Sequence, residues 1–477
     1  MILPLLMEQF LLMLVGLADT MVVSYAGEAA VSGVSLVNSF NTIFINLFTA
    51  LASGGAVVVS QYIGRRDMKM ASESSSQLLM VATVFAVVIS IPVLIWKVPL
   101  LKGLFGKVEP DVMEACKTYL RISVYSFPAL GIYNAGTALY RSIGKTSVTM
   151  KISIVSNLIN VAGNLIGVFV FRAGVAGVAY PSLIARTFSA VVITLLCFRE
   201  KEVRYVGRWI FQWNRELLKK MLSIAIPNGV ESGIFQFVKV ALSSVVALFG
   251  TYQIAANGIS QSIWSVAALI SVTMGPVFIT VIGQCMGAGD IRQAEYYFRK
   301  LTKVTVCISV AWNTLIFLIT PLLIKIFAVS RQTGQMILYL VLIHNIANAV
   351  VFPFADPLGK GLRAAGDAMF TMGISLFTTI GVRLILSILL GIVLDLGVIG
   401  IALAMCLDWT VRGVIFWIRF RQGKWKTYRV IGESPEQNNK QEEKTNEKAI
   451  GRMHRYQQIR AFSRLLFLAD SGKITKT

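Results

Sequence analysis

Long apolar stretches recur along almost the whole chain and are separated by short polar or basic segments. Each stretch has about the 20 residues that an α-helix needs to cross the hydrocarbon core of a bilayer. The pattern predicts an all-α polytopic membrane protein, and after about residue 430 the chain becomes polar. Hydrophobic windows place twelve spans near residues 2–25, 36–62, 77–99, 119–141, 147–171, 174–198, 222–249, 258–286, 301–327, 333–359, 368–394 and 396–420.

The two halves of the chain resemble each other at an offset of 223 residues. Six spans return the chain to the side where it started, so the two six-helix bundles would share one orientation. Such a duplication predicts a pseudo-twofold axis along the membrane normal and a substrate path between the bundles. The pairs aligned at this offset are Pro4 and Pro227, Glu8 and Glu231, Gly27 and Gly250, and the Gln-x2-Gly-x2-Asp segments 61–67 and 284–290. Later in the chain, the Arg-x2-Gly segments 141–144 and 363–366 align at an offset of 222 residues.

The repeat also predicts how the chain is divided. We expect an N-terminal six-helix bundle over 1–198, a basic cytoplasmic linker over 199–221, a C-terminal bundle over 222–430 and a polar cytoplasmic tail over 431–477. The Trp-containing part of the linker is typical of an interfacial helix that leads into the second bundle. The first bundle has no such lead-in, so we expect the native chain to start upstream of Met1.

The tail becomes apolar and basic at helical spacing over 449–470. Two interpretations stay open: a basic amphipathic helix on anionic lipid, or a solvated, non-essential tail.

Composition agrees with a membrane protein, since only 14% of residues are charged and 55% are hydrophobic. A soluble domain has about 25% charged residues, so a large soluble enzyme is excluded. The net charge of +21 does not indicate a nucleic-acid partner, because Lys and Arg lie mainly in loops between spans. The five cysteines are scattered without a CxxC pair or a nearby His, and we expect neither a disulfide nor a zinc site.

Basic residues also predict the orientation. They concentrate in one set of loops and in the polar segment after the last span, which places this side and both termini in the cytoplasm and the protein in the cell membrane. The basic loops are near 65–69, 141–145, 199–220, 292–300, 360–363 and 419–429.

The first span carries two carboxylates, Glu8 and Asp19, in an otherwise apolar segment. A carboxylate at the centre of a membrane helix costs roughly 2.5–3.5 kcal/mol on insertion scales, so it normally faces a wet cavity or a partner. Eleven residues turn an α-helix through about 1100°, which places both groups on one face. Glu8 has a repeat counterpart in Glu231, whereas Asp19 aligns with Leu242 and belongs to one half only. We therefore expect Asp19, rather than Glu8, to be the functional carboxylate of this span.

Several motifs together resemble the multidrug and toxic compound extrusion (MATE) family of the MOP flippase superfamily, over about residues 1–425. They are the Pro-x3-Glu repeat starts, Gly-Glu-Ala-Ala at 27–30, the Gln-x2-Gly-x2-Asp segments and Leu-Arg-Ala-Ala-Gly-Asp at 362–367. The resemblance implies two bundles around a V-shaped cavity and the exchange of cationic or amphipathic drugs for Na⁺ or H⁺.

The resemblance also implies a cation site. Asp19 matches the first-helix Asp of the family, Asn160 and Asn164 match an Asn-x3-Asp pair, Ser182 takes a Thr position and Tyr119 a Tyr position. Asn164 departs from the family pattern and removes one negative charge. Oxygen atoms of Asp19, Asn160 and Asn164 could bind Na⁺, or the lone carboxylate could take up a proton. The two Asn side chains could also serve only as hydrogen bonds between helices.

In the second half, Glu231 and Asp356 are acidic candidates for substrate contact. Arg383 aligns with Asn160 or its neighbour, and we expect it to neutralise Glu231 or Asp356. Asp408 and Arg412 are four residues apart and should compensate each other. Further candidates for the substrate cavity, where aromatic rings suit apolar cations, are Glu8, Phe235 and Trp264.

These features predict a secondary active multidrug antiporter, which is not an enzyme, needs no cofactor, acts as a monomer and takes small organic cations. The alternative is a lipid-linked saccharide flippase of the same superfamily, although such proteins have extra spans and a cationic cavity. The segment at 143–147 ends like a P-loop, but position 139 is not Gly and a membrane span precedes it, so ATP hydrolysis is not expected.

Overall fold

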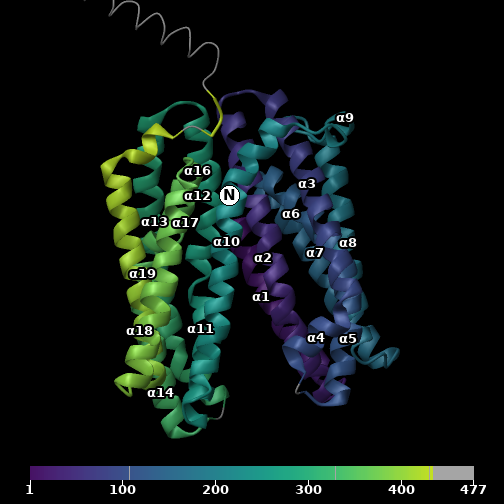
Figure 1. Ribbon diagram of the computed structural model, residues 1–477, viewed down its shortest axis with the longest axis vertical. Helices are drawn as coiled ribbons and strands as arrows, with labels where there is room; N and C mark the ends of the chain where they lie inside the picture. Colours follow the sequence, from purple (N-terminus) through teal and green to yellow (C-terminus); the bar gives the residue numbers. More distant parts are fainter. Residues whose placement is uncertain (107, 328, 429, 433–477) are drawn as a thin grey trace, which may run out of the picture. The chain divides into compact units, whose positions relative to one another are not determined.

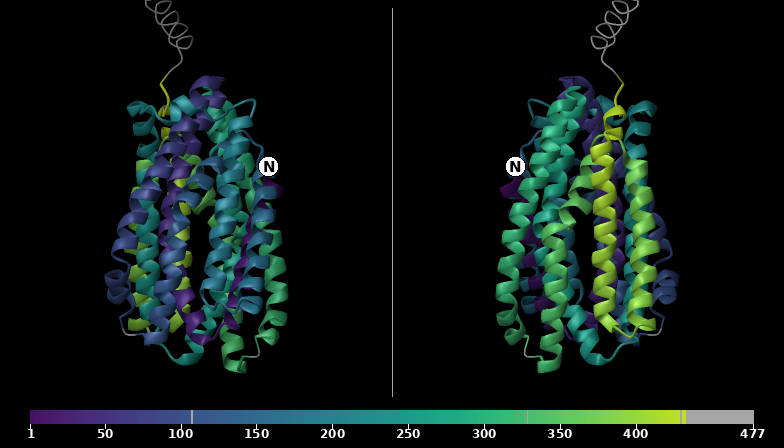
Figure 2. Two further views of the ribbon diagram at one scale, coloured as in Figure 1. Left: turned by 90° about the vertical axis from the view of Figure 1, so that its right-hand side faces the viewer. Right: turned by 90° about the vertical axis from the view of Figure 1, so that its left-hand side faces the viewer.

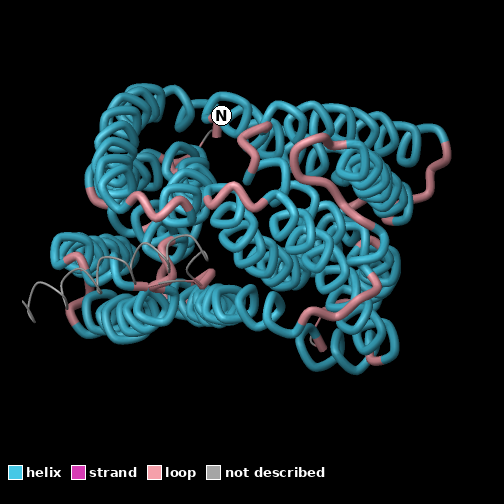
Figure 3. The backbone as a smooth tube through the Cα atoms, turned by 90° about the horizontal axis from the view of Figure 1, so that it is seen from above, coloured by secondary structure: helices cyan, strands magenta, loops and turns pink. Residues whose placement is uncertain are grey.

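A computed structural model describes residues 1–106, 108–327, 329–428 and 430–432. This part of the chain is helical throughout, with loops between the helices and no strand (Figure 3). The compact unit that it forms ends at Val430. The predicted amphipathic helix at 449–470 lies outside the described residues.

The first half of the chain forms one group of helices, called the N-lobe below (Figure 1). Its elements are α1 (Ile2–Ser24), α2 (Glu28–Gly64), α3 (Met68–Ile95), α4 (Lys97–Phe105), α5 (Pro110–Tyr125), α6 (Phe127–Ser142), α7 (Thr146–Leu165), the π-helix η1 (Ile166–Val170) and α8 (Ala176–Arg199).

The second half, after the short α9 (Gly207–Ile210), forms the C-lobe, and the side views show its long helices running between the two ends (Figure 2). Its elements are α10 (Arg215–Val246), α11 (Thr251–Ala267), α12 (Leu269–Gly287), α13 (Ile291–Ile326), α14 (Arg331–Val350), α15 (Phe352–Ala355), α16 (Pro357–Ala364), α17 (Ala368–Phe377), the π-helix η2 (Thr378–Leu384), α18 (Ile385–Ile388), the π-helix η3 (Leu389–Val393), α19 (Gly397–Gln422) and the 3-10 helix η4 (Lys424–Thr427).

Eleven described helical runs are long and apolar enough to cross a membrane. The twelfth predicted span, 119–141, is divided at Ser126 into α5 and α6, which have 16 residues each. The spans expected at 258–286 and 333–359 are also interrupted, between α11 and α12 and between α14, α15 and α16. Proline stands in the first turn of α6, α15 and α16, where its missing N–H is tolerated, so it favours a new helix start. Hydropathy does not detect such breaks.

The lobes meet where α2 crosses α10 and α12. At the crossing with α12, Gly64 lies against the carbonyl group of Gln284, and Gly287 lies against that of Gln61. A Cβ atom at Gly64 would come within 1.9 Å of the Gln284 oxygen, and one at Gly287 within 1.8 Å of the Gln61 oxygen. Only glycine allows this approach, so the repeated glycine is required by contact between the two halves.

The glutamines of the same motif hold the lobes together. Gln61 Nε2 donates to the carbonyl oxygen of Ala364 at 2.8 Å, and Gln284 Nε2 donates to that of Ser142, also at 2.8 Å. The sequence repeat relates the two hydrogen bonds to each other. Ala364 directly follows Arg363, and Ser142 directly follows Arg141, so each glutamine bonds the equivalent position of the other lobe. The joint is therefore pseudo-symmetric.

The aspartates of the motif start the next helices. Asp67 accepts a hydrogen bond from the backbone N–H of Met70 at 3.0 Å, and Asp290 accepts one from Gln293 at 2.9 Å. Both are N-caps, which satisfy backbone donors that a helix start leaves unpaired.

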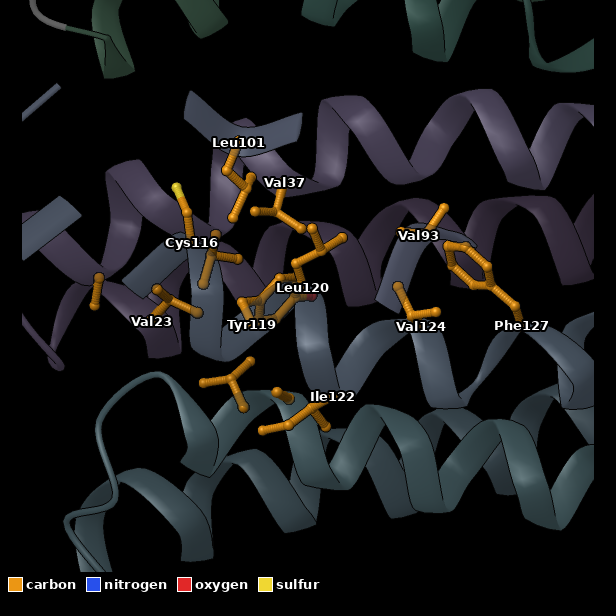
Figure 4. Close-up of a cluster of buried hydrophobic side chains, with 14 of the residues drawn as sticks. Val23, Val37, Val93, Leu101, Cys116, Tyr119, Leu120, Ile122, Val124 and Phe127 are labelled. Carbon is orange, nitrogen blue, oxygen red and sulfur yellow. The ribbon is translucent and has the colours of Figure 1, made fainter. Parts of the chain in front are cut away.

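A hydrophobic cluster fills the N-lobe between α2, α3 and α5 (Figure 4). Val37, Leu120 and Phe127 are fully buried in it, and Tyr119 is 5% exposed. The cluster fixes α5 and α6 against α2, and it places Tyr119 in the core.

The linker between the lobes is anchored on α3. Gln77 Nε2 donates hydrogen bonds to the backbone carbonyl groups of Trp209 and Gln212. The backbone N–H of Val206 donates to the Ser76 hydroxyl at 3.0 Å. The predicted lead-in helix is not a separate element, because α9 has four residues and α10 itself begins at Arg215.

Candidate transport site

Four of the residues expected at the cation site form one hydrogen-bonded chain. Asn164 Nδ2 donates to Asp19 Oδ1 at 2.6 Å and to Asn160 Oδ1 at 2.8 Å. Asn160 Nδ2 in turn donates to Ser182 Oγ at 3.3 Å. The chain connects α1 to α7 and α8, which lie far from α1 in the sequence.

Small residues allow α7 and α8 to approach closely enough for these contacts. A Cβ atom at Gly163 would be 2.6 Å from the Pro181 side chain, and the backbones of Gly167 and Gly177 touch directly. Asn160 and Asn164 are one helical turn apart, so both face Ser182 and Asp19. The four-residue spacing of Asn160 and Asn164 on α7, together with the close contact between α7 and α8, therefore brings these side chains together.

Tyr119 is not part of this chain. Its hydroxyl donates to Asn38 Oδ1 on α2 at 3.1 Å, within the hydrophobic cluster of Figure 4. The sequence interpretation placed it at the cation site, whereas the structure pairs it with Asn38.

A cavity of about 270 Å³ opens beside the chain, and Glu8, Asp19, Asn160 and Arg186 are among its lining residues. Arg186 was overlooked in the sequence, although a charged residue inside the span at 174–198 is a signal of function. Its Nη1 donates at 2.7 Å to the hydroxyl of Ser126, at the break between α5 and α6.

The two carboxylates in the cavity differ in their partners. Glu8 pairs with Arg141 at 2.9 Å and accepts a hydrogen bond from Thr149 at 3.0 Å. Asp19 has no ion pair within 4 Å among the residues described here, and Asn164 is its hydrogen-bond donor. Among the described residues, Glu8 thus has a cationic partner and Asp19 does not.

The oxygen atoms around Asp19 suit a hard cation. Asn164 Oδ1 is buried and has no hydrogen-bond partner in the described structure, so one acceptor is left over. The Asn164 amide nitrogen, however, already bridges Asp19 and Asn160. Across the described residues, no three His, Cys, Asp or Glu side chains cluster in the way typical of a zinc or other transition-metal site.

The C-lobe repeats the Glu8 ion pair. Glu231 lies 2.5 Å from Arg363, which also donates to Asn228 at 2.8 Å and to Thr371 at 3.1 Å. Glu231, Arg363 and Thr371 are the repeat counterparts of Glu8, Arg141 and Thr149, so the fold duplicates a partly buried ion pair. Glu231 is thus a structural partner of Arg363.

The expected role of Arg383 is wrong. Arg383 pairs with Asp408 at 2.7 Å, while Glu231 pairs with Arg363, and Asp356 pairs with Lys360 at 2.8 Å on its own helix end. The predicted contact between Asp408 and Arg412 is confirmed at 2.8 Å, but Asp408 serves two arginines.

The reason for this error is a change of helical register. Before η2 the repeat offset is 222 residues, as between Arg141 and Arg363, and after it the offset is 223, as between Gly174 and Gly397. The π-helix η2 takes up the extra residue, because each of its turns holds one residue more than an α-turn. Arg383 lies in η2, so the repeat alignment does not predict its direction.

A second cavity of about 270 Å³ lies in the C-lobe. Its lining includes Phe235, Lys239, Trp264 and Arg383. The two aromatic residues expected at a substrate cavity are therefore brought together, in a site whose charge the sequence did not predict.

The MatE family model matches residues 4–166 and 227–389, two segments separated by the same offset as the repeat. The chain belongs to the MATE family. It is a multi-pass membrane transporter with two lobes of six spans, and the predicted internal duplication is confirmed.

Individual relatives agree over most of their length. The chain is 27% identical to the "Uncharacterized transporter YisQ" of Bacillus subtilis, over 88% of this chain and 93% of that protein. It is 22% identical to the "Probable multidrug resistance protein NorM" of Thermotoga maritima, over 90% and 92%. The fold matches an outward-facing MATE transporter structure with a TM-score of 0.82 and 20% identity, over 88% and 94% of the two chains.

Proposed function

We propose that this MATE transporter is a secondary active antiporter that exports organic cations or amphipathic toxic compounds in exchange for Na⁺ or H⁺. The observation that carries the proposal is the Asp19 carboxylate, which lines a cavity and has no ion pair in the described structure. The name of the Thermotoga maritima relative, a probable multidrug resistance protein, supports the same class of substrate.

In the proposed cycle, Asp19 binds either the coupling ion or the cationic substrate. The oxygen atoms of Asn160 and Ser182 lie beside it and can help to hold a cation. Neutralising Asp19 removes the cost of a buried charge, and this energy difference can favour one arrangement of the lobes over the other. The Gly64–Gly287 joint lies at the helix ends that carry basic loops, which we propose face the cytoplasm.

The test is dye efflux from proteoliposomes with separately imposed Na⁺ and proton gradients. Wild type should respond to one gradient, which identifies the coupling ion. Asp19→Asn should abolish the response, whereas Asp111→Asn, which removes an exposed carboxylate on α5, should not. Efflux by Asp19→Asn that follows either gradient as in wild type would overturn the proposal.

A further inference from the structure

The C-lobe cavity has a charge opposite to that of the N-lobe cavity. Among its described lining residues the charged side chains are Lys239 and Arg383, which are both cations. The N-lobe cavity has two carboxylates, Glu8 and Asp19, and one cation, Arg186. A membrane-embedded cationic pocket without its own anion is costly unless a ligand or water completes it.

Lys239 is a positively charged residue of this cavity that has no acidic partner among the described residues. It is an exposed residue of α10, a membrane-spanning helix, and it has no ion pair within 4 Å in the part of the chain that the structure describes. Ser243, one turn later, lines the same cavity. The lysine side chain is long and mobile, so its ammonium group can follow an anion into the pocket.

Arg383 is held rigidly and is not neutralised. Its guanidinium lies 2.7 Å from Asp408, but the same carboxylate also binds Arg412 at 2.8 Å. Two arginines share one negative charge, which leaves one positive charge in excess. The rings of Phe235 and Trp409 lie 5.0 and 5.9 Å from the guanidinium and fix its plane.

Aromatic and amide groups complete the lining. Trp264 stacks on Trp409 with centroids 5.7 Å apart and planes 19° apart, and its indole N–H has no acceptor in the described structure. Asn257 and Gln261 are on the same helix as Trp264 and contribute amide groups. Flat rings with N–H donors and two cations are suited to an aromatic carboxylate.

We propose that the C-lobe cavity binds the carboxylate of an amphipathic aromatic substrate through the two cations Lys239 and Arg383. The proposal extends the export function above, because Asp19 in the N-lobe supplies the site for positive charge. A cavity of about 270 Å³ can admit one benzoate-sized group while the rest of the molecule stays outside it.

A pair of dyes tests the proposal, since rhodamine 110 has a free benzoate and rhodamine 123 is its methyl ester. Binding is measured by fluorescence anisotropy with the full chain in lipid nanodiscs. Lys239→Met should weaken rhodamine 110 binding roughly tenfold and leave rhodamine 123 within about twofold, because an unneutralised carboxylate loses a charged partner. Lys239→Arg should retain rhodamine 110 binding.

Lys325→Met is the matched control, because it removes an exposed lysine at the end of α13. It should not change the ratio of the two affinities. The proposal is overturned if Lys239→Met leaves that ratio unchanged, or if it weakens both dyes equally. This is an equilibrium measurement without gradients, so it can succeed even if gradient-driven efflux through Asp19 fails.

Discussion

At the scale of single residues, Asn164 defines how this site differs from the family pattern. Its amide nitrogen lies between the oxygen atoms of Asp19 and Asn160, where it donates hydrogen bonds to both. A neutral amide thus partly satisfies the carboxylate that a second acid would repel. We infer that the site needs less cation binding to remain stable than a site with two carboxylates.

Asn164→Asp should strengthen the response to Na⁺. Two carboxylates at hydrogen-bonding distance repel each other, so a bound cation relieves the strain. At a Na⁺ concentration ten times the dissociation constant, binding would stabilise the variant by about 1.4 kcal/mol. The measurement compares thermal unfolding in Na⁺ and K⁺ buffers of equal ionic strength.

Asn157→Asp is the control for this experiment, because Asn157 is on the same helix as Asn164 and lines the cavity beside Asp19. If both variants gain equally in Na⁺, the effect comes from added charge in the cavity and not from the Asp19 site.

The duplicated ion pairs should matter for stability. Arg363→Met leaves Glu231 partly buried without its cation, which should cost about 3–5 kcal/mol of the free energy of unfolding. The double variant Glu231→Gln/Arg363→Met should recover most of the loss. Denaturant unfolding in detergent measures both values.

Lys117→Met provides the contrast, since its ion pair with Glu114 is on the surface and should contribute less than about 1 kcal/mol. Equal losses for Arg363→Met and the double variant would show that Glu231 does not need a charged partner.

At the scale of helices, the two repeats meet through one short motif. The glycine of the motif permits backbone contact between α2 and α12. The glutamine donates a hydrogen bond to a backbone carbonyl group of the opposite lobe, and the aspartate is the N-cap of the following helix. The sequence showed the motif twice but did not show that its two copies touch. The contacts of Gly64 with Gln284 and of Gly287 with Gln61 join distant parts of the chain, so they are a property of the assembled lobes.

Gly64→Ala should open this joint. Its Cβ would come within 1.9 Å of the Gln284 oxygen, so the two helices must separate. Cys285 on α12 is 7% exposed, and its labelling by a maleimide should become several times faster. The other four cysteines are replaced by serine to make the readout specific.

Gly258→Ala is the matched substitution, because no atom lies within 4 Å of the added carbon. It should leave the labelling rate of Cys285 unchanged. Equal rates for Gly64→Ala and wild type would contradict the role of the joint.

In the molecule as a whole, the basic loops and the contact between the lobes lie at the same end of the helices. The joint between α2 and α12 lies at the helix ends beside the basic loops at 65–69 and 292–300. If these ends face the cytoplasm, as the positive-inside rule predicts, the lobes are joined on the cytoplasmic side. The Asp19 end of α1 then points toward the outside, from which the coupling ion of the proposed cycle enters.

Single cysteines test this orientation in intact cells. Lys102→Cys on α4 should react with an impermeant maleimide, whereas Lys69→Cys at the start of α3 should react only after the cells are opened. Both side chains are exposed, so a difference reports the side of the membrane. The reverse labelling pattern would invert the topology.

The membrane class, the approximate positions of the twelve spans and the duplication can all be predicted from the sequence. So can the grouping of Asp19, Asn160, Asn164 and Ser182. Hydropathy, repeat spacing and helical periodicity are carried by local stretches, and the family motifs supply the site residues. The sequence did not predict the helix break at Ser126, because a hydropathy window is much longer than the single turn at which the helix is interrupted.

Which charged side chains meet depends on how the helices pack in three dimensions. Arg383 binds Asp408 because η2 shifts the register by one residue, and Tyr119 faces Asn38 because α5 packs against α2. Arg186 enters the Asp19 cavity from α8. An ion pair forms only when two charged groups on neighbouring helices come within a few ångströms of each other. A shift of one residue in helical register turns a side chain by about 100° around the helix. Such distances are set when the helices pack, so spacing along the chain does not determine them.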